Sequence, residues 1–372
     1  MACNVIRSAK LSFFVALLAL FIQSNLFGKD PLAAIPRSDA SGVVLKSKRI
    51  FLNGTTAPYN AALLKIDEGY LLFFSHDDWL PKESLYPTDG VSSYTLDKRM
   101  GVARLDKEFT HTEERVRFLT PPKNWKKSTV KWIDPRVFTI SDTVYVMTFF
   151  YKRHKSSKNV WISTICPKTL AFSDPQNIRT HTDQMERNWI PLISKEVNPR
   201  ELPFLYTLYP TVVGTIDLIK RKAPLSGQSF DPSFPKEWKW GNLCGGSHAV
   251  LMGDHYLSFF HSHIKTTEEK RCYVMGACTF AKESPHRLLS ISPYPILFDQ
   301  IYTSKIDGKI GPLGNPGWSS HLDRVIFPCG FVCEEDESGR EVIHLSCGEN
   351  DVGIRIVTID KKKLLESLVP VS

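Results

Sequence analysis

The sequence holds one carboxylate in a setting that suits acid–base chemistry. Asp134 is followed by Pro135 and Arg136 and opens an apolar segment that includes Phe138. The proline restricts the backbone of the residue before it and would orient the carboxyl group. Burial beside Phe138 favours a protonated carboxyl group, whereas the charge of Arg136 favours the ionised form. We therefore predict that Asp134 is a general acid; the alternative is that it caps a turn and pairs with Arg136.

Asp134 opens one of five similar units. Each unit has a polar or small residue, an apolar strand, a turn, and a second apolar strand, which is the pattern of a β-hairpin. The units begin near residues 60, 134, 188, 247 and 327. Further strands are expected at 99–105, 159–165 and 272–280.

This repetition has the spacing of propeller blades. Five four-stranded blades in a ring would bury both faces of every sheet and leave few free edges. We predict an all-β chain with a single domain, a five-bladed β-propeller over residues 29–372; a two-sheet sandwich is the alternative. One short helix is expected over residues 361–368.

In a propeller the first strand of each blade lines a central channel. Residues at the start of these strands would therefore gather around one axis, although they lie far apart in the sequence. The residues concerned are Asn60, Asp134, Arg136, Arg187, Asn188, Ser247, His248 and Cys329. A concave site with a few polar groups and aromatic walls is the usual place for a ligand.

Five short motifs occur in order along the chain, one in each unit. They are Tyr59-Asn60, Asp134-Pro135-Arg136, Glu186-Arg187-Asn188-Trp189, Gly245-Gly246-Ser247 with Phe260-His261, and Gly348-Glu349-Asn350-Asp351. Their order resembles glycoside hydrolase family 130, from about residue 55 to residue 360. The members of that family are five-bladed propellers that act as β-mannoside phosphorylases and β-1,2-mannosidases, and mannosyltransferases of the same fold are relatives.

The resemblance implies a role for several residues. Asp134 matches the general acid, Asn60 and Asp351 match positions that contact the sugar, and His261 matches a histidine near the phosphate site. The chain departs from the family pattern at two places. Ile133 stands where the family has a glutamate, and residues 73–78 lack the arginine that usually follows the first hairpin.

Glycoside cleavage needs an acid on one face of the bond and a nucleophile or base on the other. For inverting hydrolysis, the second carboxylate would be Glu186, Glu349 or Asp351. In a phosphorylase, inorganic phosphate replaces water, and guanidinium groups match its geometry. Arg136, Arg187 and His261 would then hold the phosphate.

These observations predict a glycosidase or glycoside phosphorylase that acts on β-mannosides. A β-mannosyltransferase and a non-catalytic glycan-binding propeller are the alternatives. The partner is expected to be an oligosaccharide or glycan. No cofactor is expected, with inorganic phosphate as a co-substrate only in the phosphorylase reading.

Composition and motifs argue against other classes of function. Lysine and arginine exceed aspartate and glutamate by 47 − 39 = 8 residues, but no basic tract forms a nucleic-acid patch. The sequence has no phosphate-binding or dinucleotide-binding glycine motif in the required context. His261 and His263 lack a third metal ligand, so no metal site is expected.

The first residues of the chain have the pattern of a targeting segment. Arg7 and Lys10 precede an apolar run over residues 11–22, which is shorter than the roughly 20 residues of a membrane-spanning helix. We predict that residues 1–28 are a signal peptide and that the protein is secreted or periplasmic. An uncleaved N-terminal membrane anchor is the alternative.

The cysteines give a weaker signal. Eight are present, of which Cys3 would be removed with the signal peptide. The remaining seven are expected to be mainly buried thiols on strands; disulfides between Cys272 and Cys278 and between Cys329 and Cys333 are the alternative.

Overall fold

The computed structural model of the chain describes nine segments. They are residues 30–77, 98–119, 130–152, 158–173, 175–178, 188–228, 234–266, 268–305 and 322–372. The predicted signal segment 1–28 and the predicted site residue Arg187 lie outside these segments.

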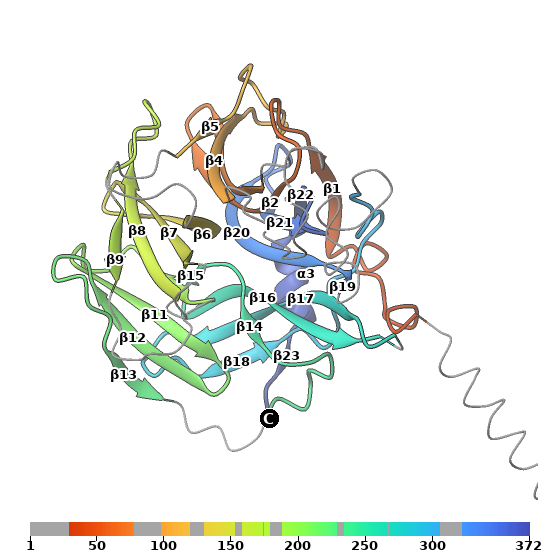
Figure 1. Ribbon diagram of the computed structural model, residues 1–372. Helices are drawn as coiled ribbons and strands as arrows, with labels where there is room; N and C mark the ends of the chain where they lie inside the picture. The colour runs from red at the N-terminus through yellow and green to blue at the C-terminus, as the bar shows by residue number, and fades with distance from the viewer. Residues whose placement is uncertain are drawn as a thin grey trace, which may run out of the picture.

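Residues 58–178 contribute two four-stranded antiparallel sheets, with strand orders β2-β3-β4-β5 and β6-β7-β8-β9 (Figure 1). The first sheet consists of β2 (Pro58–Ile66), β3 (Gly69–Asp77), β4 (Lys98–Leu105) and β5 (Arg117–Phe118). The second consists of β6 (Val130–Ile140), β7 (Thr143–Lys152), β8 (Lys158–Ile165) and β9 (Gln176–Ile178). Sequential strands pair in both sheets, so each is a meander that begins with a hairpin.

The third sheet has eleven strands, nine of them in its main path, and contains two such antiparallel units. The first unit consists of β10 (Ile190–Ile193), β11 (Glu201–Leu208), β12 (Thr211–Asp217) and β13 (Leu225–Gln228). The second consists of β15 (Ala249–Met252), β16 (His255–Lys265), β17 (Arg271–Ala281), β18 (Leu288–Ile291) and β23 (Val369–Pro370). β10 and β15 pair in parallel and join the two units. Off the main path, β14 (Cys244–Gly245) pairs with β16 and β19 (Leu322–Arg324) pairs with β17.

The fourth sheet brings the two ends of the described chain together. Its order is β1-β22-β21-β20, so the strand nearest the N-terminus pairs with a strand near the C-terminus, as the red and blue ribbons show in Figure 1. The strands are β1 (Val44–Ile50), β20 (Ile326–Glu335), β21 (Glu341–Glu349) and β22 (Gly353–Asp360).

The first strands of the antiparallel units lie next to one another. β2 contacts β6 and β20, β6 contacts β10, and β16, the hairpin partner of β15, contacts β20. Figure 1 shows β2, β6, β15 and β20 toward the middle of the molecule, with β5, β9 and β13 at its periphery. The start of β2, the start of β6 and the start of β20 are thereby brought together.

Strands with both faces buried explain the nearly continuous apolar runs in the sequence. On β3, Leu71 and Phe73 pack into the core shared with β6 to β8, while Leu72 and Phe74 pack into the core shared with β22. Successive side chains of a strand point to opposite faces. The sheet that contains β3 is therefore buried on both faces, which leaves little room there for polar residues.

The predicted all-β class and its hairpins are confirmed. The hairpins β2–β3, β6–β7, β10–β11, β15–β16 and β20–β21 begin close to the predicted starts, and β4, β8 and β17 are the strands expected after them. The expected terminal helix is α3 (Lys361–Ser367), which Asp360 caps by accepting a hydrogen bond from the Lys363 amide at 3.0 Å.

The thiols in the described part of the chain are free. Cys272, Cys278, Cys329 and Cys347 are buried, so the expectation of buried strand thiols is met by four residues. Cys166 and Cys333 are exposed and also unpaired, which excludes the Cys272–Cys278 and Cys329–Cys333 disulfides. Within the described segments, no helix has the length and apolar character that a membrane span requires.

Candidate functional site

Two inner strands start with the same local distortion. In β2, Asn60 and Ala61 lie opposite one residue of β3, and in β6, Asp134 and Pro135 lie opposite one residue of β7. This is a β-bulge, which re-aims a side chain and is common beside functional sites. Asn60 and Asp134 occupy the left-handed region, with φ of 47° and 55°. Asparagine and aspartate tolerate that region better than most residues, which explains their place in the bulges.

The two bulges bring Asn60 and Asp134 into direct contact. Asn60 Nδ2 donates a hydrogen bond to Asp134 Oδ1 at 2.8 Å, although the residues are 74 positions apart. The Asp134 amide donates to the Ser75 hydroxyl at 3.0 Å. Each of Asn60 and Asp134 is 7% exposed. The Asp134 carboxyl is thus held at the junction of the first two sheets, nearly out of solvent.

Arg136 holds the backbone of the segment that carries Asp134. Its Nη1 donates to the carbonyl oxygens of Asp134 and Pro135, at 3.0 and 3.3 Å. Its guanidinium carbon lies 5.7 Å from the ring centre of Phe149 and 5.5 Å from that of Phe327. No ion pair joins the side chains of Arg136 and Asp134, both of which the structure describes, so Arg136 contacts this segment through its backbone carbonyl oxygens.

Several buried polar atoms around Asp134 lack a partner within the described segments. They are Asn60 Oδ1, Arg136 Nε and Nη2, and His248 Nδ1. Most buried polar atoms in native proteins are hydrogen-bonded, so each exception needs a reason. A polar ligand that reached this cluster would supply the missing partners.

His248 stacks on Phe331, with ring centroids 5.0 Å apart and an interplanar angle of 1°. Burial lowers the pKa of His248 to about 4, and the charge of Arg136 acts in the same direction. The imidazole is therefore neutral near pH 7. His261 lies nearby in the same cluster, because its ring is 4.3 Å from that of Phe327, which also faces Arg136.

Ser247 and Asn188 make mainly structural contacts within the sheet. The Ser247 hydroxyl donates a hydrogen bond to the His248 carbonyl at 2.7 Å and accepts one from the Phe259 amide at 2.9 Å. Both hydrogen bonds are to backbone groups of neighbouring residues. Asn188 is half-buried, with φ of 63°. Its backbone carbonyl oxygen packs closely against Gly245, where an added Cβ would lie only 2.0 Å from that oxygen. The structure does not describe Glu186 or Arg187.

The last motif is mainly structural. Glu349 Oε2 accepts hydrogen bonds from Arg355 Nη2, at 3.1 Å, and from the Ser304 hydroxyl. Asn350 is fully buried, donates to the carbonyl oxygens of Tyr302 and Ser304, and accepts from the Val325 amide. Glu349 is thereby occupied as a structural carboxylate.

Asp351 differs from its two neighbours in the motif, because it is half-buried, with φ of 54°. Of the other two candidates for a second carboxylate, Glu349 forms a buried ion pair with Arg355, and Glu186 lies outside the described segments.

Three parts of the site were not predicted. Ser75 contacts the Asp134 amide, Phe149 and Phe327 flank Arg136, and Gly348 lies against Asn60. A Cβ at Gly348 would lie 2.0 Å from Asn60 Oδ1. Ser75 could have been noticed in the sequence as a hydroxyl residue at the end of the apolar run of β3. The contacts of Phe327 and Gly348 join different sheets, so no local sequence pattern predicts them.

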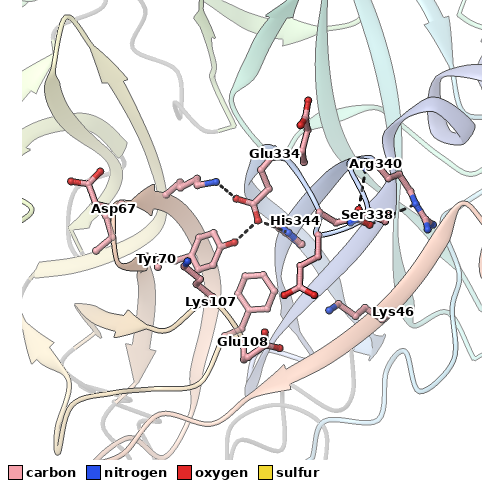
Figure 2. A pocket seen from close by; sticks show the side chains of 16 residues that line it. Lys46, Asp67, Tyr70, Lys107, Glu108, Glu334, Ser338, Arg340 and His344 are labelled. Carbon is pink, nitrogen blue, oxygen red and sulfur yellow. Dashed lines mark hydrogen bonds and ion pairs between the residues drawn. The ribbon is translucent and has the colours of Figure 1, made fainter.

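A separate cavity of about 710 Å³ lies between the β2–β3 and β20–β21 turns (Figure 2). Glu334 is at its centre, where it accepts a hydrogen bond from the Tyr70 hydroxyl, pairs with Lys65 and lies 2.9 Å from His344 Nε2. Its walls carry both charges, with Lys46 and Lys107 among the cations. None of the predicted site residues lines this cavity.

Comparisons with known proteins show similarity in structure only. No family model and no curated protein sequence matches the chain. A β-1,2-mannobiose phosphorylase from Listeria innocua, solved with β-1,2-mannobiose, matches with a TM-score of 0.59 at 16% identity, over 86% of this chain and 92% of that one.

Two further solved structures agree with this match. One comes from work on glycoside hydrolases of family 130 that target β-1,2-mannosidic linkages in Candida mannan (TM-score 0.59, 12% identity, 86% of this chain and 88% of that one). The other is a mannose phosphorylase from Leishmania mexicana, solved with phosphate (TM-score 0.53, 12% identity, 90% and 94%). The chain therefore has the fold of the mannoside phosphorylases and glycoside hydrolases of family 130.

Proposed function

We propose that the five antiparallel units are the blades of a five-bladed β-propeller. In this arrangement β2, β6, β10, β15 and β20 are the inner strands, and β1 completes the last blade by pairing with β22. The contacts between neighbouring inner strands support the ring. Pairing of an N-terminal strand with the C-terminal blade would close it and protect an edge that would otherwise be free.

Within this fold, we propose a carbohydrate-active enzyme that acts on β-mannosides, with Asp134 as general acid. One observation carries the proposal: a nearly buried carboxyl group, held by Asn60, lies among buried polar atoms that have no partner in the described part of the chain. Sugar hydroxyls donate and accept hydrogen bonds and could satisfy such atoms. The fold, shared with glycoside hydrolases and mannoside phosphorylases, agrees with this assignment.

In the proposed reaction, Asp134 gives its proton to the glycosidic oxygen as the bond to the anomeric carbon breaks. For an inverting hydrolase, a base on the opposite face removes a proton from the attacking water. We assign that role to Asp351, because Glu349 is held by Arg355. Hydrolysis also fits a protein that is exported, which is the localisation we propose from the N-terminal segment.

Phosphorolysis is the second candidate. His261 and Arg136 both lie against the Phe327 ring, and Arg136 keeps two donor nitrogens without partners among the described residues. Phosphate bound by these groups would attack the anomeric carbon in place of water and leave a sugar 1-phosphate. A mannosyltransferase and a glycan-binding propeller without catalysis remain alternatives, and no metal or organic cofactor is required by any of these functions.

The test compares two proteins, two substrates and two phosphate conditions. Purified wild-type protein and the Asp134→Asn variant are incubated with β-1,2- or β-1,4-mannobiose, with and without inorganic phosphate, and the products are measured. Mannose release without phosphate identifies a hydrolase, and phosphate-dependent mannose 1-phosphate identifies a phosphorylase. Asp134→Asn should lower turnover by at least about 100-fold, in line with loss of a general acid.

Two outcomes would contradict the proposal. Full turnover by Asp134→Asn would remove Asp134 from catalysis. If neither product forms, but a mannoside raises the melting temperature of both proteins, the chain is a glycan-binding propeller.

A further inference from the structure

Asn60 Nδ2 and Asp134 Oδ1 form a hydrogen bond that joins two sheets inside the candidate site. From this contact we propose that Asn60 is a positioning residue, which holds the Asp134 carboxyl in one orientation and keeps its proton on Oδ2. The inference rests on the proposed function, because it concerns the proton that Asp134 would transfer. It differs from the sugar-contacting role that the family resemblance implies for Asn60.

The chemistry of the contact decides where the proton lies. An amide nitrogen can only donate, so the oxygen that it contacts must accept. Oδ1 therefore has no proton facing Asn60, and Oδ2, which has no partner within the described segments, is left to carry it. The amide also stabilises the ionised form, since hydrogen bonds to a charged group are stronger than those to a neutral one.

The position of Asn60 is fixed on three sides. Its backbone is held in the β2 bulge with φ of 47°, and its side chain reaches β6 through Asp134. Gly348 of β21 lies on the third side, where an added Cβ would be 2.0 Å from Asn60 Oδ1 and 2.4 Å from Asn60 N. A side chain confined in this way loses little freedom when it orients a neighbour, which is what positioning a catalytic group requires.

The experiment measures turnover of the mannoside against pH for the full-length protein and three variants. Asn60→Ala removes the donor, and Asn60→Asp replaces it with a second carboxyl group. Ser75→Ala is the matched control, because it removes a contact to the Asp134 backbone amide and leaves the carboxyl contact in place.

For a general acid, activity is lost on the alkaline side, where the acid ionises. Without the amide donor the ionised form is less stable, so we expect Asn60→Ala to move the alkaline limb upward by about one pH unit. Asn60→Asp should move it further, since two adjacent carboxyl groups share a proton. We expect kcat to fall about tenfold in Asn60→Ala with KM changed less than about threefold, and the Ser75→Ala limb to stay in place.

An unmoved alkaline limb in both Asn60 variants would overturn the proposal. So would a raised KM with unchanged kcat, which is the result expected for a residue that only binds sugar.

A direct titration separates this inference from the proposed function. If the wild-type protein turns over no mannoside, ¹³C-labelled aspartate carboxyl signals are followed by NMR against pH, and the Asp134 signal is identified by its loss in Asp134→Asn. A higher titration midpoint in Asn60→Ala than in wild type supports the positioning contact without any activity. An equal midpoint in the two proteins overturns it.

Discussion

Glu349 Oε2 lies 3.1 Å from Arg355 Nη2, and both side chains are almost completely excluded from solvent. The same carboxylate accepts hydrogen bonds from the Thr303 amide and the Ser304 hydroxyl, so the pair anchors residues 303–304 to β21 and β22. Removing one partner of a buried ion pair leaves an uncompensated charge. The pair is therefore a stability element, although its position in a family motif suggested a second catalytic carboxylate.

The first prediction follows from that pair. Glu349→Gln keeps the shape of the side chain but leaves the Arg355 charge buried without its counterion. We expect a loss of about 3–5 kcal/mol in the free energy of unfolding, measured by urea denaturation. Turnover per folded molecule should change little, because Glu349 has no role in the proposed reaction.

Glu341→Gln is the matched control for Glu349→Gln. Glu341 pairs with Lys361 at 2.6 Å, but its side chain is 63% exposed. Exposed pairs contribute little, so the loss should stay below about 1 kcal/mol. If Glu349→Gln and Glu341→Gln lost the same free energy of unfolding, the buried Glu349–Arg355 pair would contribute no more to stability than an exposed pair.

The second prediction concerns pH and His248. The pKa of this histidine is lowered to about 4 in the folded protein, from 6.5, mainly by burial. Between these values the unfolded chain binds a proton that the folded protein does not, so stability falls as the pH drops from 6.5 to about 4 and is unaffected above 6.5. The full loss is roughly 3 kcal/mol, from about 1.4 kcal/mol per pH unit.

His248→Phe should remove this part of the pH dependence while keeping a ring against Phe331. Urea denaturation of wild type and variant at pH 7, 5.5 and 4.5 measures the difference. The half-buried His255 provides the control variant, His255→Gln. A pH dependence of stability that is the same in wild type and His248→Phe would contradict the prediction.

The third prediction tests the close approach of Gly348 to Asn60. In Gly348→Ala the new Cβ overlaps Asn60 Oδ1 and N and must displace the residue that contacts Asp134. We expect a loss of about 1–3 kcal/mol in unfolding free energy from overpacking and a fall of at least about tenfold in kcat. Denaturation and steady-state kinetics give the two numbers.

Gly253→Ala is the comparison for this variant. No atom lies within 4 Å of a Cβ there, although φ is +71°. It should lose about 1 kcal/mol through backbone strain and keep full turnover. If Gly348→Ala has wild-type kcat, the contact between Gly348 and Asn60 does not support the site.

The fourth prediction concerns Cys166, an exposed thiol in the turn after β8. The pKa of this thiol is lowered, chiefly by a hydrogen bond from the Thr169 side chain. A lowered pKa places more thiolate at neutral pH, and the thiolate is the reactive form. Iodoacetamide should therefore label Cys166 at pH 7 faster than the buried Cys278 and Cys347, as read by peptide mass spectrometry. Equal labelling rates in the native protein would contradict the assignment.

The sequence was most informative where the signal is local. A run of apolar residues broken by a short polar turn predicts a hairpin because both features act within a few residues, and Asp134, Asn60 and Arg136 could be placed at strand starts for the same reason. Their gathering in one cluster followed from repetition of the unit, since equivalent positions of similar units meet when the units pack side by side.

Only the tertiary structure decided what these residues do for one another. Asn60 and Asp134 are 74 residues apart, and whether an amide faces a carboxyl, a sugar or solvent depends on how two sheets pack. In the same way Glu349 and Asp351 share one motif, but contacts from residues 303–304 and Arg355 commit the first to the interior. Apolar runs separated by short turns determine the strands within each unit. The partner of a buried polar group is instead set by a contact between units, which leaves no pattern in the local sequence.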